Sequence, residues 1–122
     1  MVSKKGTLTN LKKSPHGKEN YDSALEREYM VELERDAAVV SWTKKHGIKI
    51  PYKFFGFTRH YLPDFLVEYK NGSREIHETK GLPLLLWLST KLKGQTAEEF
   101  CKVQGWRYKV ITKGREAFYN KI

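Results

Sequence analysis

The stretch from Tyr61 to Gly81 constrains the fold of this chain more than any other part of the sequence. Aromatic and β-branched residues, which favour strands, precede Asn71-Gly72, and polar and apolar residues alternate after it. Asn-Gly between two such runs is the strongest short-range hairpin signal, because both residues tolerate the positive φ angles that a type I′ turn requires. We therefore predict two antiparallel strands joined by a type I′ turn at residues 71–72.

This hairpin would gather charged side chains at one end of a small sheet. Asp64 lies near the start of the first strand, and Glu78 and Lys80 lie near the end of the second. Strand side chains repeat with period two, which places Glu78 and Lys80 on one face and His77 and Thr79 on the other. Two carboxylates beside an ammonium are typical of a magnesium site that water and a substrate phosphate complete. A solvated ion pair on a surface strand is the alternative interpretation.

The composition indicates one domain in a reducing compartment. The chain has 122 residues and a single cysteine, Cys101, so an intramolecular disulfide is excluded. The N-terminus is polar and basic, unlike a secretory signal, and the longest apolar run, residues 82–88, is too short to cross a bilayer. We expect a cytoplasmic protein (in the host cytoplasm if a phage encodes it) without a membrane partner.

The charge is concentrated at the two ends. The formal net charge is +9, of which residues 1–20 carry +4 and residues 90–122 carry +5, while the middle is neutral. Basic ends around clustered acids suit a protein that binds DNA. We interpret residues 1–20 as a flexible basic arm, which either lies along DNA or is a disordered tail, and residues 21–122 as the folded domain. The DNA-binding candidates are Lys12, Lys13, Arg59, His60, Lys91 and Lys93.

A first helix is predicted from Asp22 or Ser23 to about Val39. Ser23 and Glu26 have the spacing of a capping box, in which the serine caps the helix and the glutamate reaches back to it. Glu26 also lies at the top of an apolar stripe, where a buried carboxylate needs a partner. It is either a helix-capping residue or a third acid of the metal site. The stripe consists of Met30, Leu33, Ala37 and Val40.

Further elements follow from local patterns. Residues 39–47 are expected to end the helix and turn the chain, residues 48–55 to form an edge strand, and residues 56–59 to turn into the central hairpin. Helices are expected at residues 84–93 and 96–104, the second capped by Thr96 and ended by Gly105. Residues 106–112 alternate as a last strand.

The order helix, three strands, helix, strand resembles the restriction-endonuclease-like fold of the PD-(D/E)XK nucleases. That fold is α/β, a single domain with a mixed central β-sheet flanked by helices. Pro63-Asp64 and Glu78-Thr79-Lys80 match the two halves of its motif, with Glu26 before them. The same residues are similar to those of TnsA-type transposon endonucleases and phage Holliday-junction-resolving endonucleases, and residues 39–52 resemble phage head-completion nucleases.

The resemblance implies a Mg²⁺-dependent DNA endonuclease, with Mn²⁺ as a substitute ion. Glu26, Asp64 and Glu78 would hold the metal together with the backbone carbonyl of Thr79, and Lys80 would assist the attacking water. A phage or mobile-element origin, junction resolution or nicking, and a homodimer are further expectations of this resemblance. We expect no counterpart of the additional C-terminal domain of the transposon enzymes, and therefore do not expect a transposition role. The alternatives are a DNA-binding or head-completion protein without catalysis and an RNA nuclease.

Overall fold

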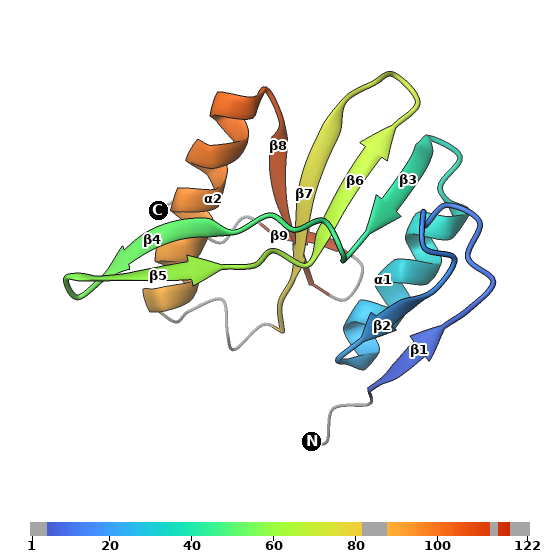
Figure 1. The fold of residues 1–122 in the computed structure, drawn as a ribbon, viewed down its shortest axis with the longest axis horizontal. Helices are drawn as coiled ribbons and strands as arrows, with labels where there is room; N and C mark the ends of the chain where they lie inside the picture. Colours follow the sequence, from blue (N-terminus) through green and yellow to red (C-terminus); the bar gives the residue numbers. More distant parts are fainter. Residues whose placement is uncertain (1–4, 82–87, 113–114, 118–122) are drawn as a thin grey trace.

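The structure is a computed structural model that describes residues 5–81, 88–112 and 115–117 (Figure 1). The elements are β1 (Gly6–Leu8), β2 (Glu19–Tyr21), α1 (Ala24–Arg35), β3 (Val39–Thr43), β4 (Ile50–Phe54), β5 (Phe57–Tyr61), β6 (Phe65–Tyr69), β7 (Arg74–Thr79), α2 (Leu88–Gln104), β8 (Arg107–Thr112) and β9 (Arg115–Ala117).

A mixed five-stranded sheet with the order β3-β6-β7-β8-β9 forms the centre (Figure 1). All neighbouring strands in it are antiparallel except β7 and β8, which are parallel and lie on either side of α2 in the chain. Residues of α1 pack on one face with Trp42 and Phe65, and residues of α2 pack on the other with Ile76. The expected α/β single domain, a mixed sheet with helices on both faces, is confirmed.

The hairpin β6–β7 is present, and its turn differs from the expected type. Of the two residues Asn71 and Gly72, only Gly72 has a positive φ, +87°. Tyr69 N–H donates to the carbonyl of Ser73, and Gly72 N–H donates back to the carbonyl of Tyr69. The loop therefore has three residues and ends in a glycine bulge, which is the next most common hairpin connection after the two-residue turns.

Helix α1 ends earlier than the sequence predicted, at Arg35. The Asp36 carboxylate accepts a hydrogen bond from Ala38 N–H, and such local bonds compete with helix formation. Residues 39–43 then form β3 instead of the helix end and turn that we expected, with Trp42 opposite Val67 of β6. Met30 and Leu33 of the predicted stripe are buried, but Ala37 and Val40 are exposed.

Residues 5–20, which belong to the predicted flexible arm of residues 1–20, include paired strand residues. Within the described residues, β1 and β2 pair antiparallel. The Glu19 carboxylate is completely buried and accepts hydrogen bonds from the hydroxyls of Ser14 and Thr43 and from Lys44 N–H. Ser14, which the composition placed in a solvated arm, is thus a hydrogen-bond partner of the buried carboxylate of Glu19.

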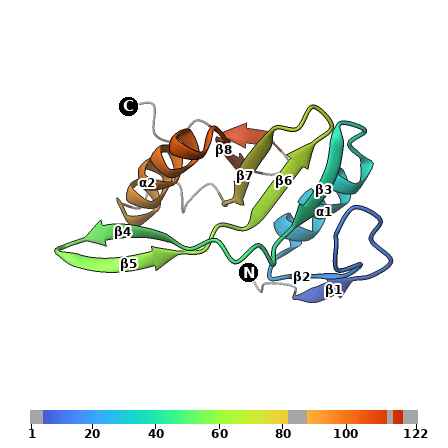
Figure 2. The same ribbon diagram turned by 45° about the horizontal axis from the view of Figure 1, so that its top comes forward.

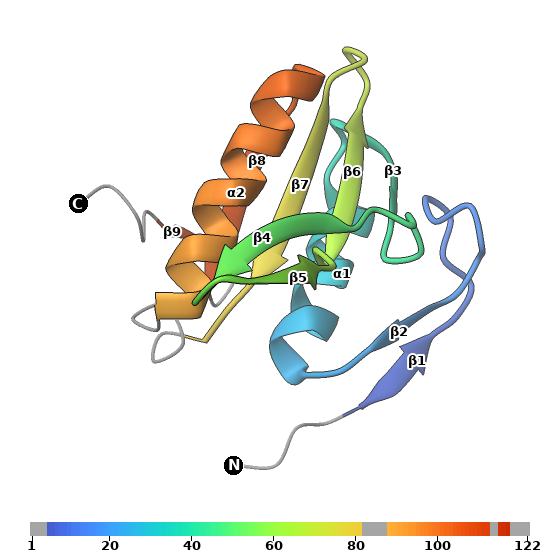
Figure 3. The ribbon, with the colours of Figure 1, turned by 60° about the vertical axis from the view of Figure 1, so that its left-hand side comes forward.

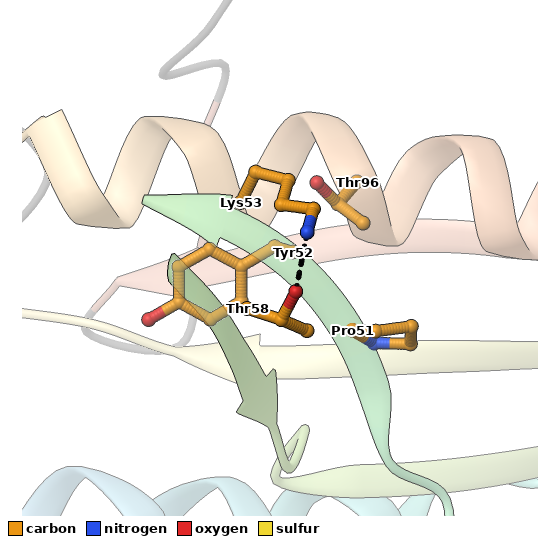
Figure 4. A pocket seen from close by; sticks show the side chains of 5 residues that line it. All are labelled: Pro51, Tyr52, Lys53, Thr58 and Thr96. Atoms are coloured by element: carbon orange, nitrogen blue, oxygen red, sulfur yellow. Dashed lines mark hydrogen bonds between the residues drawn. The ribbon is translucent and has the colours of Figure 1, made fainter. Parts of the chain in front are cut away.

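Strands β4 and β5 form a separate two-stranded ribbon. The predicted edge strand corresponds to β4, but residues 57–61 are a strand, where a turn over residues 56–59 was expected. The ribbon crosses the sheet on the same side as α2 (Figure 3) and packs with it in one apolar cluster. A hollow of about 450 Å³ lies between ribbon and helix (Figure 4). It is lined by Pro51, Tyr52, Lys53, Thr58 and Thr96.

Helix α2 is continuous, where two helices were predicted. Thr96 is not a cap, because it lies inside the helix and its hydroxyl donates to the carbonyl of Leu92. The expected end at Gly105 is confirmed: its φ is +79°, and Trp106 N–H donates to the carbonyl of Cys101 as in a Schellman motif. The expected start near Leu84 lies outside the described residues. No helix of the described residues is long and apolar enough to cross a membrane.

Candidate active site

Asp64 and Glu78 meet at one end of the β6–β7 hairpin. Asp64 N–H donates to Glu78 Oε1 at 2.9 Å. Asp64 Oδ2 accepts from both the backbone N–H and the hydroxyl of Thr79, at 2.9 and 2.7 Å. The pairing of Phe65 with His77 sets this arrangement, because it puts the residue before β6 beside the end of β7. The two carboxylates are thus held in place by backbone as well as side-chain groups.

Lys80 follows β7 and lies on the same face as Glu78. Its Nζ is 3.3 Å from Glu78 Oε2, so the structure brings together the predicted acid, acid and lysine. Tyr61, at the end of β5, is a further neighbour that the sequence did not indicate. Its side chain hydrogen-bonds to Glu78, and its hydroxyl lies 3.2 Å from that of Tyr108. An aromatic residue three positions before Asp64 gave no signal beyond strand propensity.

Burial dominates the electrostatics of the acid pair. Glu78 is 4% exposed, and its burial, together with the charge of Asp64, raises its pKa to about 7 against the opposing charge of Lys80. Burial also raises the pKa of Asp64, although its bonds from Thr79 counteract the rise. Both carboxylates are therefore held in a site that disfavours their negative charge, although Lys80 opposes this effect at Glu78 and Lys44 opposes it at Asp64.

Glu26 lies at the start of α1, and a lysine that the sequence analysis missed neutralises it. Glu26 N–H donates to Ser23 Oγ at 3.1 Å, as predicted for the cap. Its Oε1 accepts from the N–H of Asp22, one residue before the cap, and from Lys44 Nζ at 2.5 Å. Burial alone would lower the pKa of Lys44, but the hydrogen bond and charge of Glu26 raise it, and the charge of Asp64 adds to the effect.

The donor atoms at this end of the sheet fit a hard divalent cation only in part. In the part of the chain that the structure describes, no three His, Cys, Asp or Glu side chains already form a group that could hold a metal ion. Asp64 and Glu78, however, supply the carboxylate oxygens that Mg²⁺ prefers, and a cation between them would offset the charge that their partial or complete burial disfavours. The fit is that of a two-carboxylate site completed by water and phosphate.

Lys93 of α2 is a DNA-binding candidate that interacts electrostatically with Glu78. Its Nζ lies 5.9 and 5.8 Å from the ring centres of Tyr52 and Tyr61. Burial lowers its pKa, and the charge of Lys80 lowers it further while that of Glu78 opposes the change. Lys91, two residues earlier on the same helix, is half-buried. The structure therefore places Lys93 at the margin of the acid pair.

Arg59 and His60 are exposed on β5, on the strand that leads to Asp64. The guanidinium of Arg59 lies 5.6 Å from the ring centre of Phe54 on the neighbouring strand. Both basic residues are accessible to a phosphate, on the segment that enters the site.

Lys12 and Lys13 lie at the other end of α1. Their backbone N–H groups donate to the carboxylate of Glu34, and Lys13 Nζ donates to the carbonyl of Asp36. Glu34 is about 12 Å along the helix axis from Glu26, from the rise of an α-helix. The structure does not bring these two lysines together with the acid pair.

A family model described as TnsA-like endonuclease N terminal matches residues 36–113, which is more than half of the chain. The match contains Asp64, Glu78 and Lys80, whereas Glu26 on α1 precedes it. No curated protein matches this sequence at a significant level.

Proposed function

Because this chain belongs to the TnsA-like endonuclease N-terminal family, we propose that it is a metal-dependent endonuclease that hydrolyses phosphodiester bonds in DNA. The observation that carries the proposal is the pairing of half-buried Asp64 with buried Glu78, with Lys80 3.3 Å from Glu78, inside the matched segment. The net charge of +9 supports a polyanionic substrate.

Asp64, Glu78 and the backbone carbonyl of Thr79 would hold Mg²⁺, with Mn²⁺ as a substitute. The ion, when bound, would polarise the phosphate and acidify a bound water. Thr79 holds Asp64 Oδ2 through two hydrogen bonds and so restricts the rotation of that carboxylate. Lys80 would donate a hydrogen bond to the attacking water and so orient it. Its positive charge would offset the negative charge that develops on the phosphate.

Glu26 is the third acid of this proposal. Its charge contributes to the raised pKa of Asp64, which indicates that the two carboxylates are close enough to interact electrostatically. Lys44 neutralises Glu26 in the structure, at 2.5 Å. Glu26 would therefore act on the ion through a water, with Lys44 free to turn towards a DNA phosphate.

The test is incubation of the purified protein with supercoiled, linear, single-stranded and four-way-junction DNA, each with Mg²⁺, Mn²⁺ or EDTA. We expect cleavage with either ion and none with EDTA, and the substrate profile separates junction resolution and nicking from general cutting. A phage or mobile-element source would fit a preference for junctions. Cleavage at full rate in EDTA would remove the metal from the proposal. Binding without cleavage of any substrate would instead indicate a DNA-binding protein that retains the fold.

Asp64→Ala is the matched variant for this experiment. We expect it to lose cleavage and to keep its affinity for DNA, because the basic residues contact phosphate independently of the ion. Its affinity should fall steeply with salt, as that of the wild type does. Loss of binding at low salt in a folded Asp64→Ala protein would place the DNA contact at the carboxylates instead.

A further inference from the structure

The tip of the β4–β5 ribbon exposes two large aromatic side chains. Phe55 is 75% exposed and Phe57 is 71% exposed. The ribbon projects from the body, and its turn extends beyond the end of α2 in two different views (Figures 1 and 2). Phe55 makes an edge-on contact with the ring of Phe54, with 4.5 Å between the ring centres, yet most of its surface stays exposed. Exposed aromatic rings at the end of a projecting hairpin are therefore poorly explained by packing within this chain.

The backbone conformation at this tip is one that phenylalanine rarely adopts. Phe55 has φ +50° and Gly56 has φ +81°, and Phe54 pairs with Phe57 across the turn. A two-residue turn with two positive φ angles favours Asn or Gly, and a bulky residue in the left-handed region is an outlier. The conformation of the turn therefore does not explain why a phenylalanine stands at position 55. Such strained positions concentrate at functional sites.

The charge around the tip favours a nucleic acid as its partner. Residues 37–63 contain five Lys or Arg and neither Asp nor Glu. On the ribbon itself, Lys53 and Arg59 are exposed, and the Lys53 ammonium lies within 2.6 Å of the Thr58 hydroxyl (Figure 4). A second copy of the chain would bring the same positive charge against this surface, whereas DNA phosphates complement it.

We propose that Phe55 and Phe57 form an aromatic wedge that stacks on or between DNA bases, while Lys53 and Arg59 contact the flanking phosphates. Aromatic rings stack on any base, and apolar side chains inserted at a base step unstack it and kink the duplex. The proposal rests on the proposed function for the identity of the polymer, and it adds the class of substrate. DNA with unstacked, bent or unpaired bases near the cut would bind best, because it has less stacking to lose.

The fold also relates the wedge to the cut. Strand β5 runs from Phe57 to Tyr61, and Asp64 follows three residues later. Four strand residues span about 13 Å, which is the length of about four base steps along one DNA strand. The wedge would therefore distort the DNA roughly four or more steps from the scissile phosphate, and not at it.

The experiment measures base unstacking in the absence of cleavage. Wild-type protein in EDTA is added to a short duplex in which several adenines are replaced by 2-aminopurine, whose fluorescence rises on unstacking. The same duplex with a central unpaired stretch measures the preference for distorted DNA by anisotropy. We expect a fluorescence rise with the wild type and tighter binding of the distorted duplex.

The wedge variants are Phe55→Asn and Phe57→Thr, alone and combined. Asn suits the left-handed turn position and Thr suits a strand, so the melting temperature should not fall. The combined variant should abolish the fluorescence rise and weaken binding of the distorted duplex by about tenfold, from the stacking energy of one aromatic–base contact. Val103→Ser removes an apolar side chain that is 84% exposed on α2, and this control should behave like the wild type.

The outcomes separate this inference from the proposed function. A combined variant that is folded and still unstacks bases like the wild type overturns the wedge, whatever its nuclease activity. Asp64→Ala should unstack bases normally, because the wedge acts without the carboxylates. If the wild type self-associates in solution and the combined variant does not, with no fluorescence change in either, the tip is a contact between copies of the chain and the wedge is rejected.

Discussion

Strand β7 carries two buried glutamates whose surroundings differ. Glu75 is 6% exposed, with His77 Nε2 at 2.8 Å and Lys109 Nζ at 3.4 Å from its Oε1. Burial raises its pKa, but its bonds and charge interactions with His77 and Lys109 lower it below the ordinary value of a glutamate. Glu78 is 4% exposed and has a second carboxylate beside it, and its pKa is raised to about 7.

The difference separates a structural network from a site that binds a cation. The Glu75 network extends through His77, whose Nδ1 lies 2.5 Å from the hydroxyl of Tyr29, and so connects β7 to α1. Each buried polar group in it has a partner of opposite or complementary character. The pair at the other end of β7 has excess negative charge in a buried place, which is the electrostatic condition that a divalent ion relieves. Burial of a carboxylate alone would not distinguish the two.

The largest expected effect comes from neutralising Glu78. Glu78→Gln should lower the cleavage rate by about a thousandfold, because it removes a proposed ligand and its charge. Its melting temperature in EDTA should be equal to or above that of the wild type, since like-charge repulsion with Asp64 is relieved. Cleavage assays and thermal melts of one preparation measure both. A Glu78→Gln protein that cuts normally, or that is less stable than the wild type, would show that Glu78 has a structural role like that of Glu75.

Glu26→Gln should give a smaller loss, because the proposed contact is through water. We expect cleavage to fall by about ten- to a hundredfold, as for outer-shell partners of a metal. Gln can still accept from Asp22 N–H, so the helix cap should lose less than about 1 kcal/mol. A titration with Mg²⁺ or Mn²⁺ should recover part of the rate. Wild-type cleavage across that titration would leave Glu26 as a helix-capping residue only.

Glu75→Gln should show the opposite signature. His77 and Lys109 would lose a charged partner, and we expect a loss of about 2 kcal/mol in the free energy of unfolding. Denaturant unfolding measures this change. Cleavage well below the melting temperature should stay within a few-fold of the wild type, because the proposed ligands are untouched. A folded Glu75→Gln protein without cleavage would show that the two ends of β7 act as one site.

The features that the sequence predicted well are local ones. The β6–β7 hairpin follows from Asn71-Gly72 and strand propensity, and its register brings Asp64 to Glu78. Gly105 ends α2 because a left-handed residue is required there. In both cases the residues that determine the structure are neighbours in the chain, so the pattern contains the information.

The features that it missed depend on distant partners. Val40 continues the apolar stripe of the predicted helix in sequence, but pairing with β6 and the Asp36 turn select a strand over residues 39–43. Lys44 directly follows that strand, so its bond to Glu26 was not predictable once β3 was missed. Thr96 has a capping pattern but lies inside α2, where Ala97 and Cys101 bury their side chains. Tertiary burial decided against a local signal at each of these positions.

The acid pair should also give a pH and metal dependence of stability. The pKa of Glu78 is raised from an ordinary 4.5 to about 7 in the folded state. Folding therefore favours its protonated form, and this contribution to stability is lost as the pH rises from about 4.5 through about 7. Melting temperatures in EDTA across that range should fall more for the wild type than for Glu78→Gln.

At pH values above about 7, Mg²⁺ at about ten times its dissociation constant should add about 1.4 kcal/mol to the free energy of unfolding of the wild type. Equal gains in the Glu78→Gln protein would place the ion elsewhere.

The smallest expected effect concerns the lysine of the Glu75 network. Lys109→Met should lower the free energy of unfolding by about 1 kcal/mol, because the Lys109 side chain is only 23% exposed and its ammonium balances a buried carboxylate. The control is Arg74→Met, which breaks an ion pair with Glu68 on the same sheet at 3.9 Å, where both side chains are at least 40% exposed. Denaturant unfolding should show a change within about 0.3 kcal/mol for that variant, since solvent screens an exposed pair. Both variants should cleave DNA at the wild-type rate. If Lys109→Met and Arg74→Met lower the free energy of unfolding equally, the ion pair of Lys109 with Glu75 stabilises the fold no more than an exposed pair does. The difference between the two ends of β7 would then depend only on the carboxylate of Asp64 beside Glu78.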